Sequence, residues 1–224
     1  MNTGNLTLRY VFQEPRERNG EKSPILLLLH GFGSNEQDLI SFAPYLDKRF
    51  FIASARAPFT TDFGGFAWFQ IRYGIRGMEI DTKQAEESRN LLLKFVDELI
   101  SEHDLDANEV YLAGFSQGAI MIHSLVLTAP EKFAGAVPMS GVFPAQYLDH
   151  RATDSALKDF PIFVSHGVYD AVLPVQLGRE AKAQLEKLPV KLDYKEYPNA
   201  HNVSEESLRD VVVWLSDKLN KAAK

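Results

Sequence analysis

The chain has 224 residues, of which 45% are hydrophobic and 24% are charged, and it contains no cysteine. This composition is typical of a globular protein and excludes a disordered, collagenous or coiled-coil chain. Without cysteine, disulfides, thiolate nucleophiles and zinc sites with cysteine ligands are also excluded. The formal net charge of −6 argues against a nucleic-acid partner, which usually binds a basic surface. We expect one domain covering residues 1–224.

The first residues are polar and lack the basic stretch and apolar core of a targeting segment. The longest clear apolar run near the start covers residues 25–29, whereas a membrane-spanning helix needs about 20 residues. We therefore predict a cytoplasmic protein without an integral membrane segment.

Short apolar runs rich in β-branched residues alternate along the chain with longer segments of helical periodicity. The predicted strands are residues 6–12, 25–29, 51–54, 110–113, 134–139, 162–165 and 192–197. The predicted helices are residues 81–102, 116–129, 175–188 and 204–221. This alternation indicates an α/β fold, with a mainly parallel central sheet and helices on both faces. The first strand alternates apolar and polar residues, which predicts an antiparallel, half-exposed strand at an edge.

The pentapeptide Gly114-Phe115-Ser116-Gln117-Gly118 follows one of these strands and precedes a predicted helix. This is the G-x-S-x-G pattern in the strand–turn–helix context that a nucleophilic serine requires. The sharp turn holds the serine hydroxyl clear of the sheet, and a side chain at position 114 or 118 would clash there. The alternative is an ordinary glycine-rich turn in which Ser116 caps the helix.

A serine hydroxyl needs a base that takes its proton, and in this strand–helix order an acid and then a histidine should follow the serine. Asp170 lies five residues past the predicted strand that ends at Ser165, and His201 lies four past the strand that ends at Tyr197. No other histidine follows Asp170. Taken singly, Asp170 could form a turn and His201 could sit in a surface loop, but together with Ser116 they predict a catalytic triad.

The other histidines carry weaker signals. His103 and His150 lie in polar stretches and are predicted to be solvated, and His123 is expected near the surface. His166, at the end of a predicted strand, is expected to be structural, with a supporting role behind the triad as the alternative. No two histidines are spaced as neighbours on one helix face, so we predict no metal site.

Acyl transfer also needs two backbone N–H groups that point to the developing oxyanion. We expect them from Gln117, which follows the nucleophile, and from Phe32 in the glycine-rich loop after an early strand. A dinucleotide-binding loop is a weaker alternative, because Glu36 stands where that motif needs its third glycine.

These strand-end segments resemble the phospholipase/carboxylesterase family of α/β-hydrolases, which includes acyl-protein thioesterases and small bacterial carboxylesterases. The matching segments are residues 28–36, 114–119, 165–170 and 197–204. The resemblance implies an α/β-hydrolase fold and a hydrolase of esters or thioesters without a cofactor. The family's triad and oxyanion donors fall on the residues derived above. One departure is Ala200 before His201, where family members usually have glycine.

Residues 59–73 hold six aromatic side chains, a strong local excess over the 11% of the whole chain. Because this segment follows a strand end, we predict that it forms a wall of the acyl pocket, together with residues just after Asp170. The predicted lining residues are Phe66, Trp68, Phe69, Val172 and Leu173. The alternative is a loop that folds its aromatic side chains into the protein's own core.

The leading functional hypothesis is a serine hydrolase that cleaves small-molecule esters or thioesters of small to medium acyl groups through an acyl-enzyme intermediate. Lysophospholipase or acyl-protein thioesterase activity is an alternative, and a homodimer is left open. A serine peptidase of this fold usually has a large extra domain, for which the chain has no spare length. A non-catalytic binding protein on the same fold should carry a broken triad.

Overall fold

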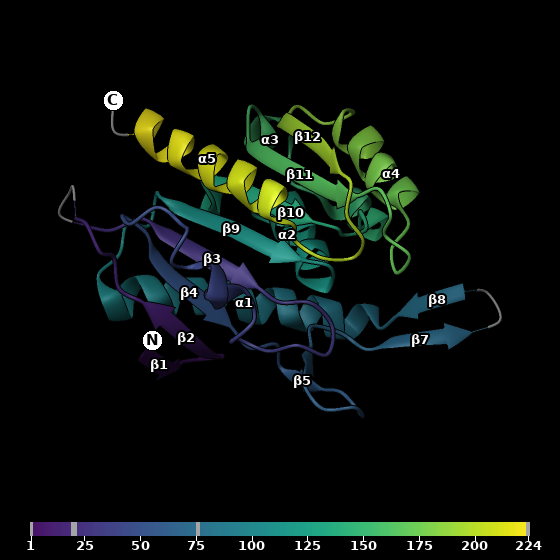
Figure 1. The fold of residues 1–224 in the computed structure, drawn as a ribbon, viewed down its shortest axis with the longest axis horizontal. Helices are drawn as coiled ribbons and strands as arrows, with labels where there is room; N and C mark the ends of the chain where they lie inside the picture. The colour runs from purple at the N-terminus through teal and green to yellow at the C-terminus, as the bar shows by residue number, and fades with distance from the viewer. Residues whose placement is uncertain (1, 19–21, 75–76, 223–224) are drawn as a thin grey trace.

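The computed structural model describes residues 2–18, 22–74 and 77–222, and an eight-stranded sheet runs through its centre (Figure 1). The strand order is β1-β2-β4-β3-β9-β10-β11-β12. The strands are β1 (Asn2–Asn5), β2 (Arg9–Gln13), β3 (Ile25–Leu29), β4 (Phe51–Ala55), β9 (Val110–Phe115), β10 (Gly135–Met139), β11 (Pro161–Gly167) and β12 (Lys191–Tyr197). All neighbours from β4 to β12 are parallel, which confirms the predicted fold class.

Helices cover both faces of the sheet, as the fully apolar strands predict. They are α1 (Thr82–His103), α2 (Gln117–Thr128), α3 (Asp154–Leu157), α4 (Val175–Leu185) and α5 (Glu205–Ala222). Alternate residues of β3 show the two layers. Ile25, Leu27 and Leu29 pack in one core cluster with α1, α2 and α4, and Leu26 and Leu28 pack in the other with α5. Figure 1 looks onto the α5 side. Within the described residues, no helix is both long and apolar enough to cross a membrane.

The first predicted strand is wrong in its bounds and in its place at the edge. The chain turns within residues 6–8, so that β1 and β2 form an antiparallel hairpin, and β1 lies at the edge while β2 pairs with β4. Tyr10, Val11 and Phe12 are consequently all buried. The ring of Tyr10 packs edge-on against Phe95 of α1, with 5.2 Å between the ring centroids, whereas Val11 faces the α5 side.

The connection from β4 to α1 forms two hairpins that had no predicted structure. The first joins β5 (Phe59–Thr60) to β6 (Phe66–Ala67), and the second joins β7 (Ile71–Gly74) to β8 (Gly77–Ile80). The β7–β8 hairpin projects past the carboxyl ends of the parallel strands (Figure 1). The aromatic-rich segment therefore lies beside the end of the sheet where open α/β proteins place their sites.

Two of the histidine predictions are corrected by the packing. His123 is buried rather than near the surface, because α2 is covered on every side and Phe143 packs on the His123 ring at a centroid distance of 5.7 Å. His103 is not simply solvated, since its Nε2 lies 2.8 Å from the Tyr10 hydroxyl. His150 is exposed, as predicted.

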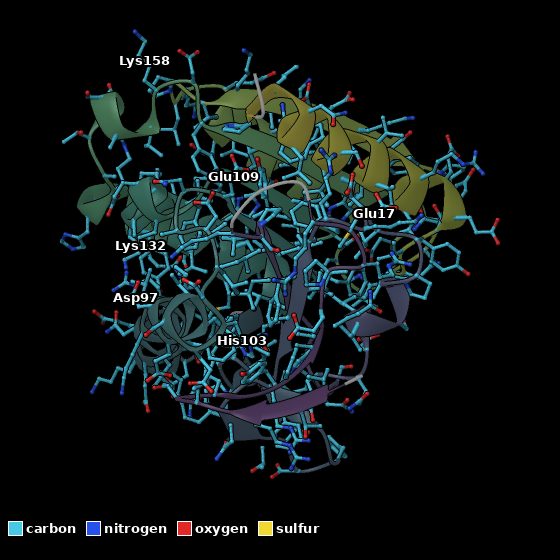
Figure 2. The ribbon with its side chains drawn as sticks, turned by 90° about the vertical axis from the view of Figure 1, so that its left-hand side faces the viewer. Glu17, Asp97, His103, Glu109, Lys132 and Lys158 are labelled. Carbon is cyan, nitrogen blue, oxygen red and sulfur yellow. The ribbon has the colours of Figure 1, made fainter. Side chains whose placement is uncertain are left out.

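The amino ends of the parallel strands form the opposite side of the molecule, which faces the viewer in Figure 2. Charged side chains are exposed there, and an ion pair of 2.6 Å joins Lys132 to Asp97. Glu109, just before β9, accepts a hydrogen bond of 2.8 Å from the hydroxyl of Tyr111. Burial is the main cause that raises the pKa of Glu109 above its usual range, and the charge of Asp106 adds to it.

Candidate active site

The turn from β9 to α2 has the strained geometry that the G-x-S-x-G pattern predicts. Ser116 has φ 54° and ψ −114°, a backbone conformation that costs a non-glycine residue about 1–3 kcal/mol. A Cβ on Gly118 would overlap the carbonyl oxygen of Leu29, and a Cβ on Gly114 would lie 2.9 Å from the backbone carbonyl carbon of Gly118. Both positions must therefore be glycine for α2 to start so close to the sheet. The Ser116 side chain makes no capping bond with α2, which disfavours the alternative of an ordinary helix cap.

The three residues predicted as a triad lie in one hydrogen-bonded chain. Nε2 of His201 is 2.9 Å from Oγ of Ser116, and Nδ1 of His201 is 2.6 Å from Oδ2 of Asp170. The Asp170 side chain has no exposed surface, whereas that of His201 is 17% exposed. Since a carboxylate only accepts hydrogen bonds, Nδ1 carries the imidazole proton and Nε2 is free to accept the proton of the Ser116 hydroxyl.

Backbone groups hold the carboxylate of Asp170 in place. Its Oδ1 accepts the N–H groups of Val172 at 2.9 Å and Leu173 at 2.8 Å. The side chain of Val172 is exposed beside the triad, whereas that of Leu173 is buried. On the other side, the Phe115 ring packs on the His201 ring with 4.7 Å between the centroids. The histidine and the acid are thus both confined before any substrate binds.

His166 is a second histidine next to Asp170, for which the sequence predicts a structural role, with a supporting role behind the triad as the alternative. Its Nε2 donates to the carbonyl oxygen of Leu173 at 2.7 Å and lies 3.6 Å from Oδ2 of Asp170. It is fully buried, and the absence of a side chain at Gly178 in α4 makes room for its ring. The sequence signal for a role beside the acid was the position of His166 at the end of β11, four residues before Asp170.

The glycine-rich loop after β3 lies against the nucleophile. An ideal Cβ on Gly31 would be 3.4 Å from Cβ of Ser116, so the two backbones are close. The N–H of Gly33 donates to the carbonyl oxygen of Phe66 at 2.9 Å, and the N–H of Phe66 donates to the carbonyl oxygen of Ser34 at 2.8 Å. The side chain of Phe32, the residue after Gly31, is exposed. The predicted donor loop is therefore tied to the aromatic-rich segment by two backbone hydrogen bonds.

The side chain of Gln117 makes the same kind of connection from the helix. Its Oε1 accepts the backbone N–H of Trp68 at 2.8 Å, and its Nε2 donates to the carbonyl oxygen of Phe69 at 2.6 Å. The Gln117 side chain is fully buried, and both of its polar atoms form hydrogen bonds with the backbone instead of with water. Sequence reasoning placed the N–H of Gln117 but not its side chain, because the partners lie 48 and 49 residues away in the chain.

The structure places the predicted acyl-wall residues differently. Trp68 and Phe69 are 0% exposed and belong to the core, which favours the alternative of an aromatic loop folded inward. Phe66 is partly exposed, with the Arg56 guanidinium 4.2 Å from its ring centroid. Phe63, at the tip of the β5–β6 hairpin, is 94% exposed. Of the aromatic residues predicted for the wall, only Phe66 keeps surface that a substrate can contact.

Two buried ionisable groups support the glycine-rich loop. Glu36 receives hydrogen bonds of 2.6 and 2.5 Å from Arg56. Burial disfavours the charge on Glu36, but these bonds outweigh it and hold its pKa below the usual range. His30 donates from Nδ1 to the carbonyl oxygen of Gly31 at 2.7 Å and accepts the N–H of Ala57 at Nε2. Burial lowers the pKa of His30, so it is neutral and keeps this donor and acceptor pair.

Known proteins resemble this chain over most of its length. The acyl-protein thioesterase 1 of Kluyveromyces lactis is 30% identical over 211 residues, which cover 87% of this chain and 92% of that protein. A probable carboxylesterase of Arabidopsis thaliana, named SOBER1-like, is 26% identical over 93% of this chain and 84% of its own. The crystal structure of the Bacillus cereus carboxylesterase superposes with a TM-score of 0.83 at 24% identity, covering 96% of both chains.

A model of the family described as Phospholipase/Carboxylesterase matches residues 13–219 of the chain. The match includes the elbow, the glycine-rich loop and the loops that carry Asp170 and His201. The solved carboxylesterase agrees in fold, with an α/β-hydrolase arrangement of sheet and helices. The chain therefore belongs to the phospholipase/carboxylesterase family of α/β-hydrolases and is a hydrolase of the esterase type.

Proposed function

We propose that this protein is a serine hydrolase that cleaves carboxylic esters or thioesters of small to medium acyl groups, with Ser116, His201 and Asp170 as its triad. The observation that carries the proposal is the continuous hydrogen-bonded chain from the buried Asp170 through His201 to Ser116 on a strained turn. The names of the relatives, acyl-protein thioesterase and carboxylesterase, support the substrate class.

In the acylation step, the hydroxyl of Ser116 attacks the acyl carbon while Nε2 of His201 takes the hydroxyl proton. The resulting imidazolium is stabilised by the carboxylate of Asp170, 2.6 Å from Nδ1. The same Nε2 proton then passes to the alcohol or thiol as it leaves. A water molecule, deprotonated by His201 in turn, attacks the acyl-enzyme and releases the acid and the free serine.

The negative charge on the carbonyl oxygen needs two donors, and we assign them to the N–H groups of Phe32 and Gln117. Gln117 is the first residue of α2, where the N–H groups of a helix have no partner within it. In the glycine-rich loop, the N–H groups of Gly33 and Ser34 already donate to backbone oxygens. We assign the second donor to the N–H of Phe32, which follows Gly31, the residue whose backbone lies close to Ser116.

The acyl group would lie against the apolar side chains that are exposed around the triad. Phe32, in the loop that approaches Ser116, and Val172, whose N–H binds Asp170, are both exposed, and Phe66 is partly exposed. Lysophospholipids and acyl-proteins are alternative substrates of the same chemistry. The cytoplasmic location, the single domain and the homodimer stay predictions.

The direct test is Ser116→Ala, with Ser124→Ala as a matched control on the same helix. Ser124 is buried and donates only to the carbonyl oxygen of Met121. We expect Ser116→Ala to lower kcat on p-nitrophenyl butyrate by more than about 10³-fold and to abolish labelling by a fluorophosphonate probe. Ser124→Ala should keep both. Ester hydrolysis by Ser116→Ala above about 1% of wild type would rule out the assignment.

A further inference from the structure

The two proposed oxyanion donors belong to elements that are separate in the chain. Phe32 lies in the loop after β3, and Gln117 starts α2. Donors of this kind act only when both lie about 2.7–3.1 Å from the oxyanion, so their spacing must be held to a fraction of an ångström. A misplacement of about 1 Å can cost about 100-fold in rate.

Residues 66–69 are bonded to both of these elements. On the loop side, the backbone of Phe66 pairs with Gly33 and Ser34, and the indole N–H of Trp68 donates to the carbonyl oxygen of His30 at 2.9 Å. On the helix side, the N–H of Trp68 and the carbonyl oxygen of Phe69 hold the two ends of the Gln117 amide. The same short segment therefore joins the two arms of the proposed oxyanion hole.

The segment is itself anchored and close-fitting. Ser88 of α1 donates to the carbonyl oxygen of Trp68 at 2.5 Å, and Trp68 has no exposed surface. At the preceding turn, a Cβ on Gly65 would overlap the carbonyl oxygen of Gly33, and both glycines have positive φ, 80° and 75°. The backbone of the segment thus lies directly on the backbone of the donor loop.

We propose that residues 66–69 form an oxyanion brace, in which Trp68 and the side chain of Gln117 are positioning residues that set the spacing between the N–H groups of Phe32 and Gln117. This inference rests on the proposed function and replaces the acyl-wall role of Trp68. The brace acts on the transition state of every acyl substrate alike, because the oxyanion is common to all of them. A core tryptophan without this role would change stability only.

The test compares the chain's two tryptophans. Trp68→Phe removes one indole hydrogen bond from the brace. Trp214→Phe removes an indole hydrogen bond of 2.7 Å to Asp193 in the core cluster on the other face of the sheet. Both variants keep an aromatic ring at a largely buried position. The constants kcat and KM are measured on p-nitrophenyl acetate, butyrate and octanoate. The enzyme concentration is taken as the concentration of protein that a fluorophosphonate labels at completion, so that unfolded protein is not counted.

We expect Trp68→Phe to lower kcat about 10- to 100-fold by the same factor on all three esters, with KM within twofold of wild type. Trp214→Phe should stay within twofold in both constants, although both variants lower the thermal midpoint. Gln117→Met, which keeps the proposed N–H donor and loses both amide bonds, should repeat the kcat loss and serves if Trp68→Phe folds poorly.

A kcat within threefold of wild type in both Trp68→Phe and Gln117→Met would overturn the brace. A loss of kcat that grows with the length of the acyl chain would also overturn it, because that pattern indicates an acyl wall. An equal loss in Trp214→Phe would also overturn it, because general destabilisation would then explain the effect. Ser116→Ala, measured on the same three esters but normalised to total folded protein because it lacks the serine that the probe labels, separates the two proposals. If it stays active, the proposed function fails. If it is inactive while the brace variants keep their kcat, only the brace fails.

Discussion

The carboxyl and amino ends of the parallel strands carry the same types of polar residue in opposite environments. At the carboxyl end, the side chains of Asp170 and Glu36 are 0% and 2% exposed, and each has fixed partners. At the amino end, the paired side chains of Lys132 and Asp97 are 35% and 60% exposed, on the side that Figure 2 shows. Charges removed from water interact strongly with their neighbours, whereas solvated pairs contribute little.

This difference in burial explains why catalysis is expected only at the carboxyl ends of the parallel strands. A parallel sheet places the start of its helices at the carboxyl end, where strand-to-helix turns such as the one at Ser116 can present a side chain. The amino end also holds a histidine, His103, but it packs among aromatic rings and its hydrogen-bond partner is the Tyr10 hydroxyl. The two histidines His201 and His103 therefore differ in the end of the sheet at which they lie, and not in residue type.

The largest expected effect separates two aspartates, one from each end. Asp170→Asn should lower kcat by about 10⁴-fold, because the imidazole loses its orientation and the partner of its positive charge. Asp97→Asn breaks the exposed pair with Lys132 and should leave kcat unchanged. Steady-state kinetics on p-nitrophenyl butyrate check both variants. Equal activity of the two would show that the buried acid has no catalytic part.

The second effect concerns the stability of an ion pair at each end. Arg56→Met leaves the carboxylate of Glu36 buried, with Arg9 at 3.6 Å as its remaining cation, and should lower the free energy of unfolding by about 3 kcal/mol. Lys132→Met should change it by less than about 1 kcal/mol. Urea denaturation at pH 7 measures both. A loss of the same size for the two variants would contradict the difference in environment.

The third effect is a pH dependence of stability from His123, a histidine whose Nδ1 has no hydrogen-bond partner among the described residues. Burial lowers its pKa to about 3. The unfolded chain, in which histidine titrates near about 6.5, then binds a proton that the folded protein does not. Stability should therefore fall as the pH drops from about 6.5 toward 3, by up to about 1.4 kcal/mol per pH unit from this group.

His123→Leu should reduce that slope by about one proton, measured by urea denaturation between pH 4 and pH 7. The pH dependence from the carboxylates remains in the variant and serves as the internal control. An unchanged slope would mean that His123 is protonated in the folded protein as readily as in the unfolded chain.

The parallel strands and the strand-end residues could be predicted because their signals are local. The apolar run of β3 gave its bounds, Ile25–Leu29, without error. The order of Ser116, Asp170 and His201 after successive strands was enough to predict the three side chains that the structure brings together. Each of these signals depends on the spacing of hydrophobic residues along one strand or helix, or on the geometry of a single turn. Both can be recognised in a short stretch of sequence.

The errors arose where a residue's environment depends on distant parts of the chain. The burial of Trp68 follows from partners at Gln117 and His30, and the burial of His123 follows from the segment that carries Phe143. Similarly, β2 is covered because the preceding residues fold back as β1. A density of aromatic residues near a strand end is compatible with both a pocket wall and a core, and packing decides between them.

The central claim is that Ser116 carries the acyl group during turnover, which a covalent measurement tests most directly. The wild-type protein is mixed with p-nitrophenyl octanoate, quenched in acid within the first turnovers, digested and analysed by mass spectrometry. We predict an octanoyl group in place of one hydrogen on the peptide that contains Ser116, and none after the same treatment of Ser116→Ala. An acyl group on another residue, or rapid turnover with no acyl-peptide at any quench time, would contradict the account.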